Sequence, residues 1–404
     1  MKCKNCSEEL NAGAKFCPGC GAKVEAAPEL CKKCNAKLEP GKKFCPECGE
    51  KAEAGAEQGG TSGAGSNDAS QREAQILFEL GKEQADNEQY ADAVKSFTRA
   101  IVLDPSNAEY YLNRGNAYVE DNSKALADLN KAVELDPSNA EYYGERGFCY
   151  FAQEDYPKAF ADLNKAIELA PGNAEYYNNR GLVYDTLEDH SKALVDFSKA
   201  IELDPNNAKY YKDRGLSYFM LDGYSKALVD FSKAIELDSD DAEAYYSRGL
   251  VYFSAQEDYS NALADFNKAV ELDPDDAKYY NNRGKAYREL KDHSKALADY
   301  SKAIELEPDN PEYYKNRGIV YYILDDNRKS LADYSKAIEL EPDNADHYND
   351  RAFAYELMDS YSKAVKDLEM AYELDPSDER LELIEDAKAE KKDNSLLGKL
   401  FGKK

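Results

Sequence analysis

The 404-residue sequence lacks several features that would assign it to common protein classes. It has no apolar run long enough to span a bilayer, and its first residues, MKCKNC, do not form a signal peptide. It contains no Walker loop, no G-x-S-x-G elbow and no H-E-x-x-H motif. We therefore expect a cytoplasmic protein that is not an enzyme.

Positive charge is also scarce, since the formal net charge is −27. Residues 1–51 contain ten Lys and seven Glu, a net +3, so residues 52–404 carry −30. A body this acidic repels nucleic acid and anionic lipid unless a local basic patch outweighs it.

Cysteine is nearly absent beyond residue 48, which argues against a disulfide framework running through the chain. Eight of the nine cysteines form two C-x2-C…C-x2-C sets with a shift of 28 residues: Cys3, Cys6, Cys17 and Cys20, then Cys31, Cys34, Cys45 and Cys48. Each set can place four thiolates around one metal ion and leaves no open position for chemistry. The pattern resembles a tandem zinc ribbon, which implies two zinc ions. Iron is the alternative, because rubredoxin-type sites share the cysteine knuckle.

The residues of this cysteine module allow two kinds of partner, a nucleic acid or another protein. Lys32, Lys33, Lys42 and Lys43 are basic, but two zinc–tetrathiolate centres would reduce the net charge from +3 to about −1. Only Phe16 and Phe44 are available for base stacking. We therefore favour a structural or protein-docking module, with contact to DNA or RNA as the alternative. The ninth cysteine, Cys149, is expected to fill the core of a helix pair.

Arg-Gly pairs recur with a nearly constant period through the rest of the chain. They begin at Arg114, Arg146, Arg180, Arg214, Arg248, Arg283 and Arg317, and Arg351-Ala352 follows in register. The steps are 32, 34, 34, 34, 35, 34 and 34 residues, which indicates stacked helix pairs that cannot bury their apolar faces alone. Within 174–207, Tyr177, Gly181 and Tyr184 recur at helical spacing, and Ala193, Phe197 and Ala200 do so again.

These columns resemble the tetratricopeptide repeat over about 74–378. The resemblance implies an all-α fold, a right-handed α-solenoid of nine helix pairs, in addition to the small zinc-ribbon module. Helix A of a repeat carries the YYNNRG-like motif, with Leu80-Gly81 in place of Arg-Gly in the first repeat, and helix B ends before a proline in eight of the nine repeats, with Ser239 as the exception. We predict a zinc-ribbon module at 1–51, a flexible linker at 52–72, repeats at 73–378, a capping helix at 379–394 and a basic amphipathic tail at 395–404.

The repeated motif is interpreted as a packing motif, because an active site is built once and not nine times. Each motif arginine has an aspartate partner column on helix B. We predict pairing within a repeat, such as Arg180–Asp196, since pairing with the preceding repeat would leave Arg114 opposite Ser96. His190, His293 and His347 each replace a repeat tyrosine, so a structural role is expected.

The resemblance also implies that helix-A residues beside the packing stripe line a concave groove. Its expected residues are Phe148, Phe151, Lys209, Lys212, Leu216, Phe219, Met220, Tyr246, Leu250, Phe253, Ile319, Tyr322 and Ile323. We expect a mainly acidic rim, with Lys209 and Lys212 as a local exception. The family's clamp for a C-terminal carboxylate is not matched in any three consecutive repeats, so chaperone-tail binding of that type is not expected.

The sequence thus predicts a non-catalytic scaffold that binds a peptide segment with apolar and basic residues. The alternative is a nucleic-acid-associated adaptor, in which the ribbons contact DNA or RNA and the repeats recruit proteins. The tail SLLGKLFGKK places Leu396, Leu397, Leu400 and Phe401 on one helical side, beside three lysines. We favour a solvated tail, and contact with a membrane surface or a partner is the alternative.

Overall fold

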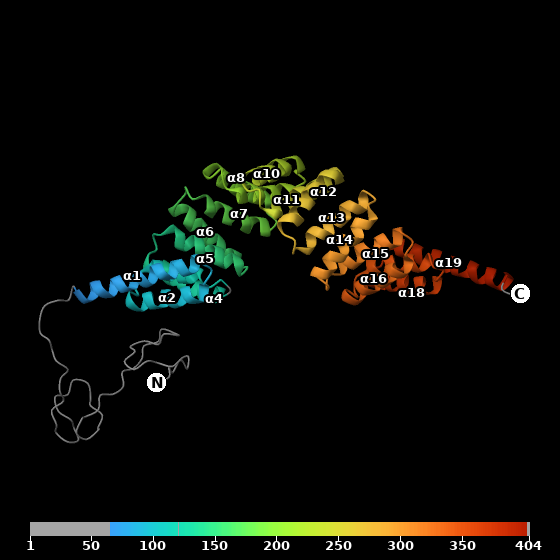
Figure 1. Cartoon of the computed structure of the whole chain (residues 1–404), viewed down its shortest axis with the longest axis horizontal. Coiled ribbons are helices and arrows are strands. Elements are labelled where there is room, and N and C mark those ends of the chain that lie inside the picture. The colour runs from blue at the N-terminus through green and yellow to red at the C-terminus, as the bar shows by residue number, and fades with distance from the viewer. Residues whose placement is uncertain (1–64, 120, 402–404) are drawn as a thin grey trace, which may run out of the picture. The chain divides into compact units, whose positions relative to one another are not determined.

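The computed structural model describes residues 65–119 and 121–401, and the side chains of 70–119 and 121–390 (Figure 1). The described part consists of 19 α-helices and contains no strand. The cysteine module lies outside the described residues. The helices divide into two compact units, one ending at Thr186 and the other beginning at Leu187, and each unit is considered by itself.

The helices alternate between A and B positions of successive repeats. The first unit contains α1 (Gly65–Asp86), α2 (Tyr90–Leu103), α3 (Ala108–Asn116), α4 (Asn122–Leu135), α5 (Ala140–Ala152), α6 (Tyr156–Leu169) and α7 (Ala174–Thr186). The second contains α8 (His190–Leu203), α9 (Ala208–Met220), α10 (Tyr224–Leu237), α11 (Ala242–Gln256), α12 (Tyr259–Leu272), α13 (Ala277–Glu289), α14 (His293–Leu306), α15 (Pro311–Ile323), α16 (Asn327–Leu340), α17 (Ala345–Glu356), α18 (Tyr361–Leu374) and α19 (Asp378–Phe401).

Two helices extend beyond the boundaries expected from sequence. Helix α1 begins inside the segment that we expect to be a linker. Helix α19 continues across 394/395, where we expect the cap to end and the tail to begin. The two glycines of the tail, Gly398 and Gly402, lower helix propensity there, yet Gly398 lies inside the helix.

Short polar side chains fix where the helices begin. The residue before most A helices is Asn or Asp, and its side chain accepts a hydrogen bond from the backbone N–H two or three residues later, as at Asn207 and Asp241. Most B helices begin after an aspartate whose side chain accepts a hydrogen bond from the backbone N–H three residues later, as at Asp155 and Asp292. Such caps satisfy N–H groups that have no partner within the helix.

The turn between helix A and helix B requires a left-handed backbone in most repeats. The residues with positive φ are not glycines, and φ lies between 51° and 62° at Glu88, Glu154, Glu188, Asp222, Glu257, Lys291, Asp325 and Asp359. This conformation costs about 1–2 kcal/mol at a residue with a Cβ atom. Packing of the two helices therefore imposes a conformation that the residue types do not favour.

Helix-A glycines allow helix B to approach closely, as the packing interpretation of the repeated motif requires. A Cβ atom on Gly215 would lie 2.8 Å from Phe231, and one on Gly284 would lie 2.8 Å from Tyr300. Both aromatic rings are fully buried. Separations this short are not tolerated, so a larger residue at either glycine would force the helices apart.

Each described motif arginine joins three helices. Seven of the eight predicted pairs lie within one unit, and in each of them the arginine Nε and Nη2 donate to both oxygens of the aspartate on its own helix B, with Nε–Oδ2 distances of 2.7–2.8 Å. The prediction is confirmed for these pairs: Arg114–Asp128, Arg146–Asp162, Arg214–Asp230, Arg248–Asp265, Arg283–Asp299, Arg317–Asp333 and Arg351–Asp367. Arg180–Asp196 would join residues on either side of the division and stays a prediction.

The arginine also contacts the preceding repeat, which the sequence analysis did not predict. Its Nη1 donates to a hydroxyl or amide oxygen two residues after the preceding aspartate, as in Arg317 to Ser301 at 3.1 Å and Arg146 to Asn130 at 2.9 Å. The guanidinium lies over the tyrosine three residues earlier, such as Tyr314 at 5.8 Å. Each arginine therefore connects successive repeats as well as the helices of one repeat.

One buried hydroxyl in the core leads to a first prediction. Tyr300 is fully buried and its hydroxyl has no hydrogen-bond partner in the described part of the chain, whereas Phe231 fills the equivalent position two repeats earlier. We expect Tyr300→Phe to raise the free energy of unfolding by about 1–3 kcal/mol, because an unpaired polar group no longer has to be desolvated. Phe231→Tyr, the matched change in the opposite direction, should destabilise the array. Urea denaturation followed by circular dichroism measures both, and a destabilised Tyr300→Phe would contradict the prediction.

Candidate ligand-binding faces of the A helices

The A helices of the second unit form a continuous layer, because α9, α11, α13, α15 and α17 contact one another in succession. In the first unit, α5 and α7 contact each other. Within each unit, a B helix packs on the A helix of its own repeat and on the helix that follows it, and α8, at the start of the second unit, packs on α9. We call the side of the A helices that faces away from the B helices the A face of each unit, and all of the predicted groove residues belong to A helices.

The structure distributes the predicted groove residues over both A faces. Phe148 and Phe151 lie in the first unit, and the others lie in the second. Three apolar members are well exposed: Phe148 at 42%, Met220 at 61% and Ile323 at 50%. Lys209 is also exposed, and the remaining members are half-buried: Phe151, Lys212, Leu216, Phe219, Tyr246, Leu250, Phe253, Ile319 and Tyr322.

The half-buried aromatics owe their position to packing within the repeats. The Phe219 ring lies 5.8 Å from Tyr224, and the Phe253 ring lies 5.3 Å from Tyr259, at the start of the following B helix. Tyr246 lies between Phe266 and Tyr279, with ring centroids 5.9 and 4.9 Å away. Burial, with Asp276 and Glu312 nearby, raises the pKa of Tyr246 to about 12. All three aromatic side chains therefore stabilise the stack and remain half-buried.

Polar side chains of the second unit form a connected network on its A face. Asn316 Nδ2 donates to Asn281 Oδ1 at 2.9 Å, and Asn281 Nδ2 donates to Glu312 Oε1 at 3.2 Å. Lys285 Nζ reaches the same Glu312 oxygen at 2.6 Å. Burial of Glu312 opposes its ionisation, but the ammonium of Lys285 and the two amides outweigh it and hold the pKa of Glu312 below its usual value.

Sequence reasoning did not predict this network. Asn316 precedes a motif arginine, where Asn113, Asn179 and Asn282 stand in other repeats, and neither it nor Asn281 nor Lys285 was predicted as a site residue. Their positions along the helix could have indicated them, because Asn281 immediately precedes Asn282 and Lys285 lies one helical turn after Asn281. Lys212, predicted to bind a ligand, is instead held by Asp241 at 2.8 Å and Glu243 at 3.0 Å.

The A helices of the two units differ in the charged residues that they carry. In the second unit, Lys278, Lys285 and Lys315 add basic groups to the A helices. In the first unit the acids dominate: Glu109, Glu141, Glu145 and Glu175. Burial, then the charges of Glu175 and Glu141, raise the pKa of Glu145 to about 7.

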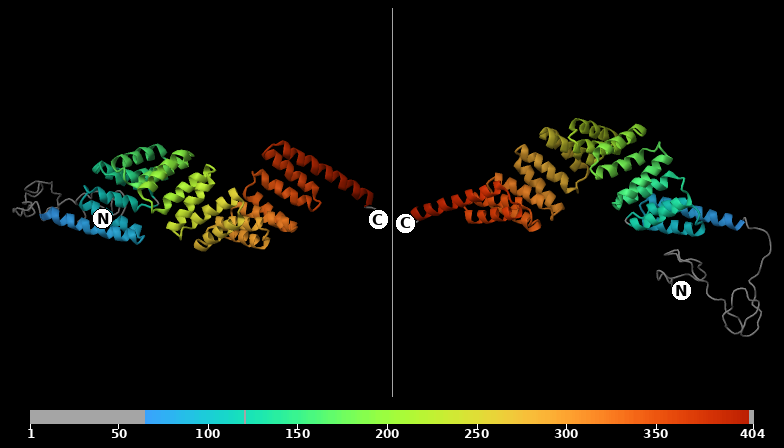
Figure 2. Two further views of the ribbon diagram at one scale, coloured as in Figure 1. Left: turned by 90° about the horizontal axis from the view of Figure 1, so that it is seen from above. Right: turned by 180° about the vertical axis from the view of Figure 1, so that it is seen from behind.

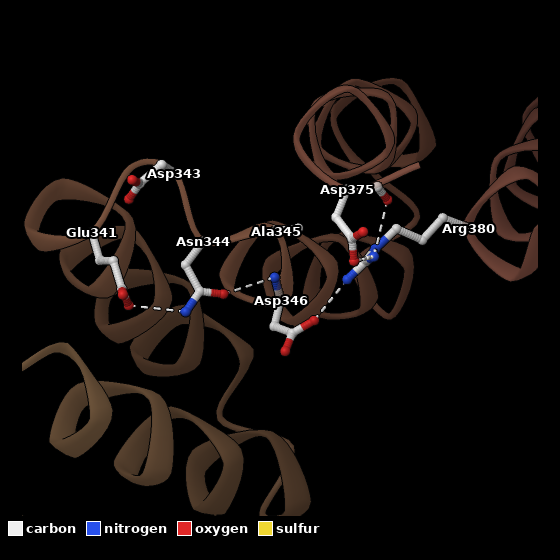
Figure 3. Close-up of a pocket in the computed structure, with 7 residues that line it drawn as sticks. All are labelled: Glu341, Asp343, Asn344, Ala345, Asp346, Asp375 and Arg380. Carbon is white, nitrogen blue, oxygen red and sulfur yellow. Dashed lines mark hydrogen bonds and ion pairs between the residues drawn. The ribbon is translucent and has the colours of Figure 1, made fainter. Parts of the chain in front are cut away.

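A separate polar pocket lies where α19 joins the repeats (Figure 3). Arg380 donates to Asp346 Oδ1 at 2.8 Å and to the Asp375 carbonyl at 3.0 Å, and it also contacts the Asp375 carboxylate. These bonds attach α19 to the α18–α19 turn and to α17. The contacts that anchor α19 thus account for the pocket. The repeat pattern of the sequence did not predict Arg380.

The histidine interpretation agrees with the structure at His347. This side chain is buried, and its Nε2 lies 2.9 Å from Glu341 Oε2. Tyr313 occupies the equivalent place one repeat earlier, and its hydroxyl donates to Glu307 Oε2 at 2.9 Å. His347 thus replaces a tyrosine in a structural bond. Among the side chains that the structure describes, no group of His, Cys, Asp or Glu is arranged to hold a metal ion.

Comparison with protein families identifies the repeats. Models described as TPR repeat match residues 81–122, 147–188, 223–256, 253–291 and 284–325. Tetratricopeptide repeat models match 108–139, 174–207, 311–344 and 334–366, so that repeat matches cover more than half of the chain. The chain belongs to the tetratricopeptide repeat family. The fold is the predicted all-α repeat array, and the family is typically a non-catalytic scaffold for protein–protein interaction.

The cysteine module of this tetratricopeptide repeat protein also matches a known family. A double zinc ribbon model covers residues 3–49, which include all eight cysteines of the two sets. Four thiolates per set suit zinc as a structural ligand shell. The module is therefore a zinc-binding one.

Solved structures resemble the repeat array in fold. The Cut9–Hcn1 hetero-tetramer of the APC/C is 15% identical, with a TM-score of 0.51, and the match covers 78% of this chain and 76% of that chain. A tetratricopeptide repeat protein from Parabacteroides merdae is 20% identical, with a TM-score of 0.48, covering 62% and 98%. YrrB, described as a TPR protein with an unusual peptide-binding site, is 27% identical, with a TM-score of 0.40, covering 45% and 93%. Among curated protein sequences, none matches.

One further property concerns membranes. None of the described helices of this tetratricopeptide repeat protein is both long and apolar enough to cross a bilayer.

Proposed function

We propose that the protein is a cytoplasmic, non-catalytic scaffold whose second A face binds a peptide segment with apolar anchors and flanking Lys or Arg. The observation that carries this proposal is the row of accessible apolar groups on α9, α11 and α15. Met220 and Ile323 are well exposed, and Phe219 and Phe253 are half-buried. Exposed apolar residues on a repeat surface usually mark a recognition site.

The decisive experiment removes these apolar groups and measures capture of partners from the native cell. Phe219→Ala/Phe253→Ala should weaken capture while the array stays folded, and Met220→Ser/Ile323→Ser should do so with less cost to stability because these two side chains pack less. Val195→Ala/Val229→Ala is the matched control, since both valines are exposed on B helices. Unchanged capture by both folded groove variants would count decisively against this face.

The zinc-ribbon module is proposed to hold two zinc ions and to act as an accessory docking site. Its eight cysteines offer two complete tetrathiolate shells. So short a segment cannot fold on apolar burial alone, so metal binding is part of its folding. Purified protein should contain close to two zinc ions per chain by elemental analysis. Chelation should unfold the module and leave the helical circular dichroism signal intact; less than one metal ion per chain, or disulfides under cytosolic conditions, would refute the assignment.

The second candidate function is an adaptor whose ribbons contact DNA or RNA. The basic residues Lys32, Lys33, Lys42 and Lys43 favour it, and the low module charge opposes it. The full chain and residues 72–404 should be compared on immobilised DNA and RNA over a salt series. Salt-dependent retention that requires residues 1–51 would favour the adaptor, and equal behaviour of the two proteins would favour the protein scaffold.

A further inference from the structure

The A face of the first unit carries four carboxylates that form no ion pair with Lys or Arg among the described residues. These are Glu109, Glu141, Glu145 and Glu175, which come from three successive A helices, α3, α5 and α7. Lys82 of α1 is bound to Glu79 at 2.9 Å, and the charges of Glu79 and then of Glu109 raise the pKa of its ammonium. Burial and their mutual repulsion raise the pKa values of Glu141 and Glu145.

The same helix positions are neutralised in the second unit. Glu109, Glu141 and Glu175 are second residues of their helices, as are Glu243, Glu312 and Asp346. Glu243 is paired with Lys212 at 3.0 Å, Glu312 with Lys285 at 2.6 Å, and Asp346 with Arg380 at 2.8 Å. A cation thus pairs with the carboxylate at this position in the second unit, whereas no Lys or Arg among the described residues forms an ion pair with it in the first unit.

An exposed apolar side chain, Phe148, lies beside these carboxylates. Phe148 follows Glu145 by three residues on α5, so the two lie on one side of the helix. Phe148 is 42% exposed, and its ring is 6.2 Å from Phe151. A ligand that suits this face combines apolar side chains with several positive charges and has no carboxylate side chains.

The C-terminal segment, residues 395–404, has this composition. It contains Leu396, Leu397, Leu400, Phe401 and three lysines, and it has no Asp or Glu. The end of α19 projects beyond the other helices of its unit (Figure 2).

We propose that residues 395–404 of one copy dock on the A face of α3, α5 and α7 of a second copy. The contact joins two different surfaces, so it is heterologous and links copies head to tail. This inference goes beyond the proposed function, because it uses residues other than the α9–α15 apolar row and concerns self-association.

A direct binding experiment tests the contact. The probe is a fluorescein-labelled peptide of residues 393–404, and the protein is the chain that ends at Asn394. Binding, followed by fluorescence anisotropy, should weaken at least about tenfold in Glu141→Gln/Glu145→Gln/Glu175→Gln and weaken with added salt. The matched control Glu243→Gln/Glu312→Gln should change affinity less than about twofold. Replacing Leu397 and Leu400 of the peptide by Ser should also weaken binding.

Self-association of the intact protein gives the second measurement. In sedimentation velocity, the average mass of the full chain should rise with concentration, and that rise should be lost in the chain ending at Asn394 and in the triple Gln variant. A full chain that stays monomeric, together with a peptide that does not bind the truncated chain, overturns the proposal. So does a peptide that binds phosphatidylserine-containing vesicles but not the protein. Phe219→Ala/Phe253→Ala should leave both measurements unchanged, so this failure and that of the proposed function are distinguishable.

Discussion

Replacing Arg317 by alanine should lower the free energy of unfolding by about 3–5 kcal/mol, the largest effect that we expect from one side chain. The substitution leaves Asp333 largely buried without the guanidinium that now binds both of its oxygens. It also removes the bond to Ser301 on the preceding B helix. Urea denaturation gives the total change, and hydrogen exchange should localise it to α14, α15 and α16, because repeats interact with their neighbours alone.

A double substitution separates two contributions to the free energy of unfolding: the cost of leaving the Asp333 carboxylate buried without a partner, and the stabilisation by its ion pair with Arg317. Arg317→Met/Asp333→Leu removes both charges and keeps similar volume, so it should be far less destabilising than Arg317→Ala. The first repeat supports this expectation, because it has Leu80 and Ser96 in these places, and Ser96 bonds to Gln84 at 2.7 Å instead. Equal destabilisation by the single and double variants would show that packing, not charge, accounts for the loss.

Glu145→Gln should stabilise the protein at pH 8 by about 2–3 kcal/mol and have little effect near pH 4. The pKa of Glu145 is raised to about 7 in the folded protein by burial and by the charges of Glu175 and Glu141. The folded state therefore holds this proton more tightly than the unfolded state does. The stability associated with the protonated carboxyl is complete below the ordinary pKa of 4.5 and is lost as the pH rises through 7.

The difference in unfolding free energy between variant and wild type should thus grow between pH 4.5 and pH 7 and be constant above that range. Denaturation at a series of pH values measures it, and the carboxylates that do not interact with Glu145 cancel in the difference. Glu243→Gln is the control, because Glu243 already has Lys212 as a partner and should gain no stability at high pH. A difference that is independent of pH would show that Glu145 is not held in its neutral form.

Most of the architecture could be predicted because the repeat presents the same local signal many times. Gly215, Gly249 and Gly284 recur at the place where an aromatic ring of helix B must approach. The period of the repeat, the residue types that recur within it and the prolines all indicate the same succession of helices. The Arg–Asp pairs could also be assigned, since the first repeat lacks both partners. The A-face sites were predicted less completely, because a column shows which helix side a residue occupies and not which partner reaches it.

Sequence by itself determined the repeat fold, the zinc-binding cysteine sets and the partners of seven arginines, because each depends on residue type and spacing along the chain. Only the tertiary structure decided how the charges are distributed between the A faces. Glu243 and Glu141 occupy the same column, yet Glu243 meets Lys212 from the preceding A helix and Glu141 meets no cation there. Likewise, Glu154 and Lys291 adopt a left-handed turn because the packed helices demand it. Contacts between residues about one repeat apart are set by how the helices stack, and that stacking is what tertiary structure adds to the pattern.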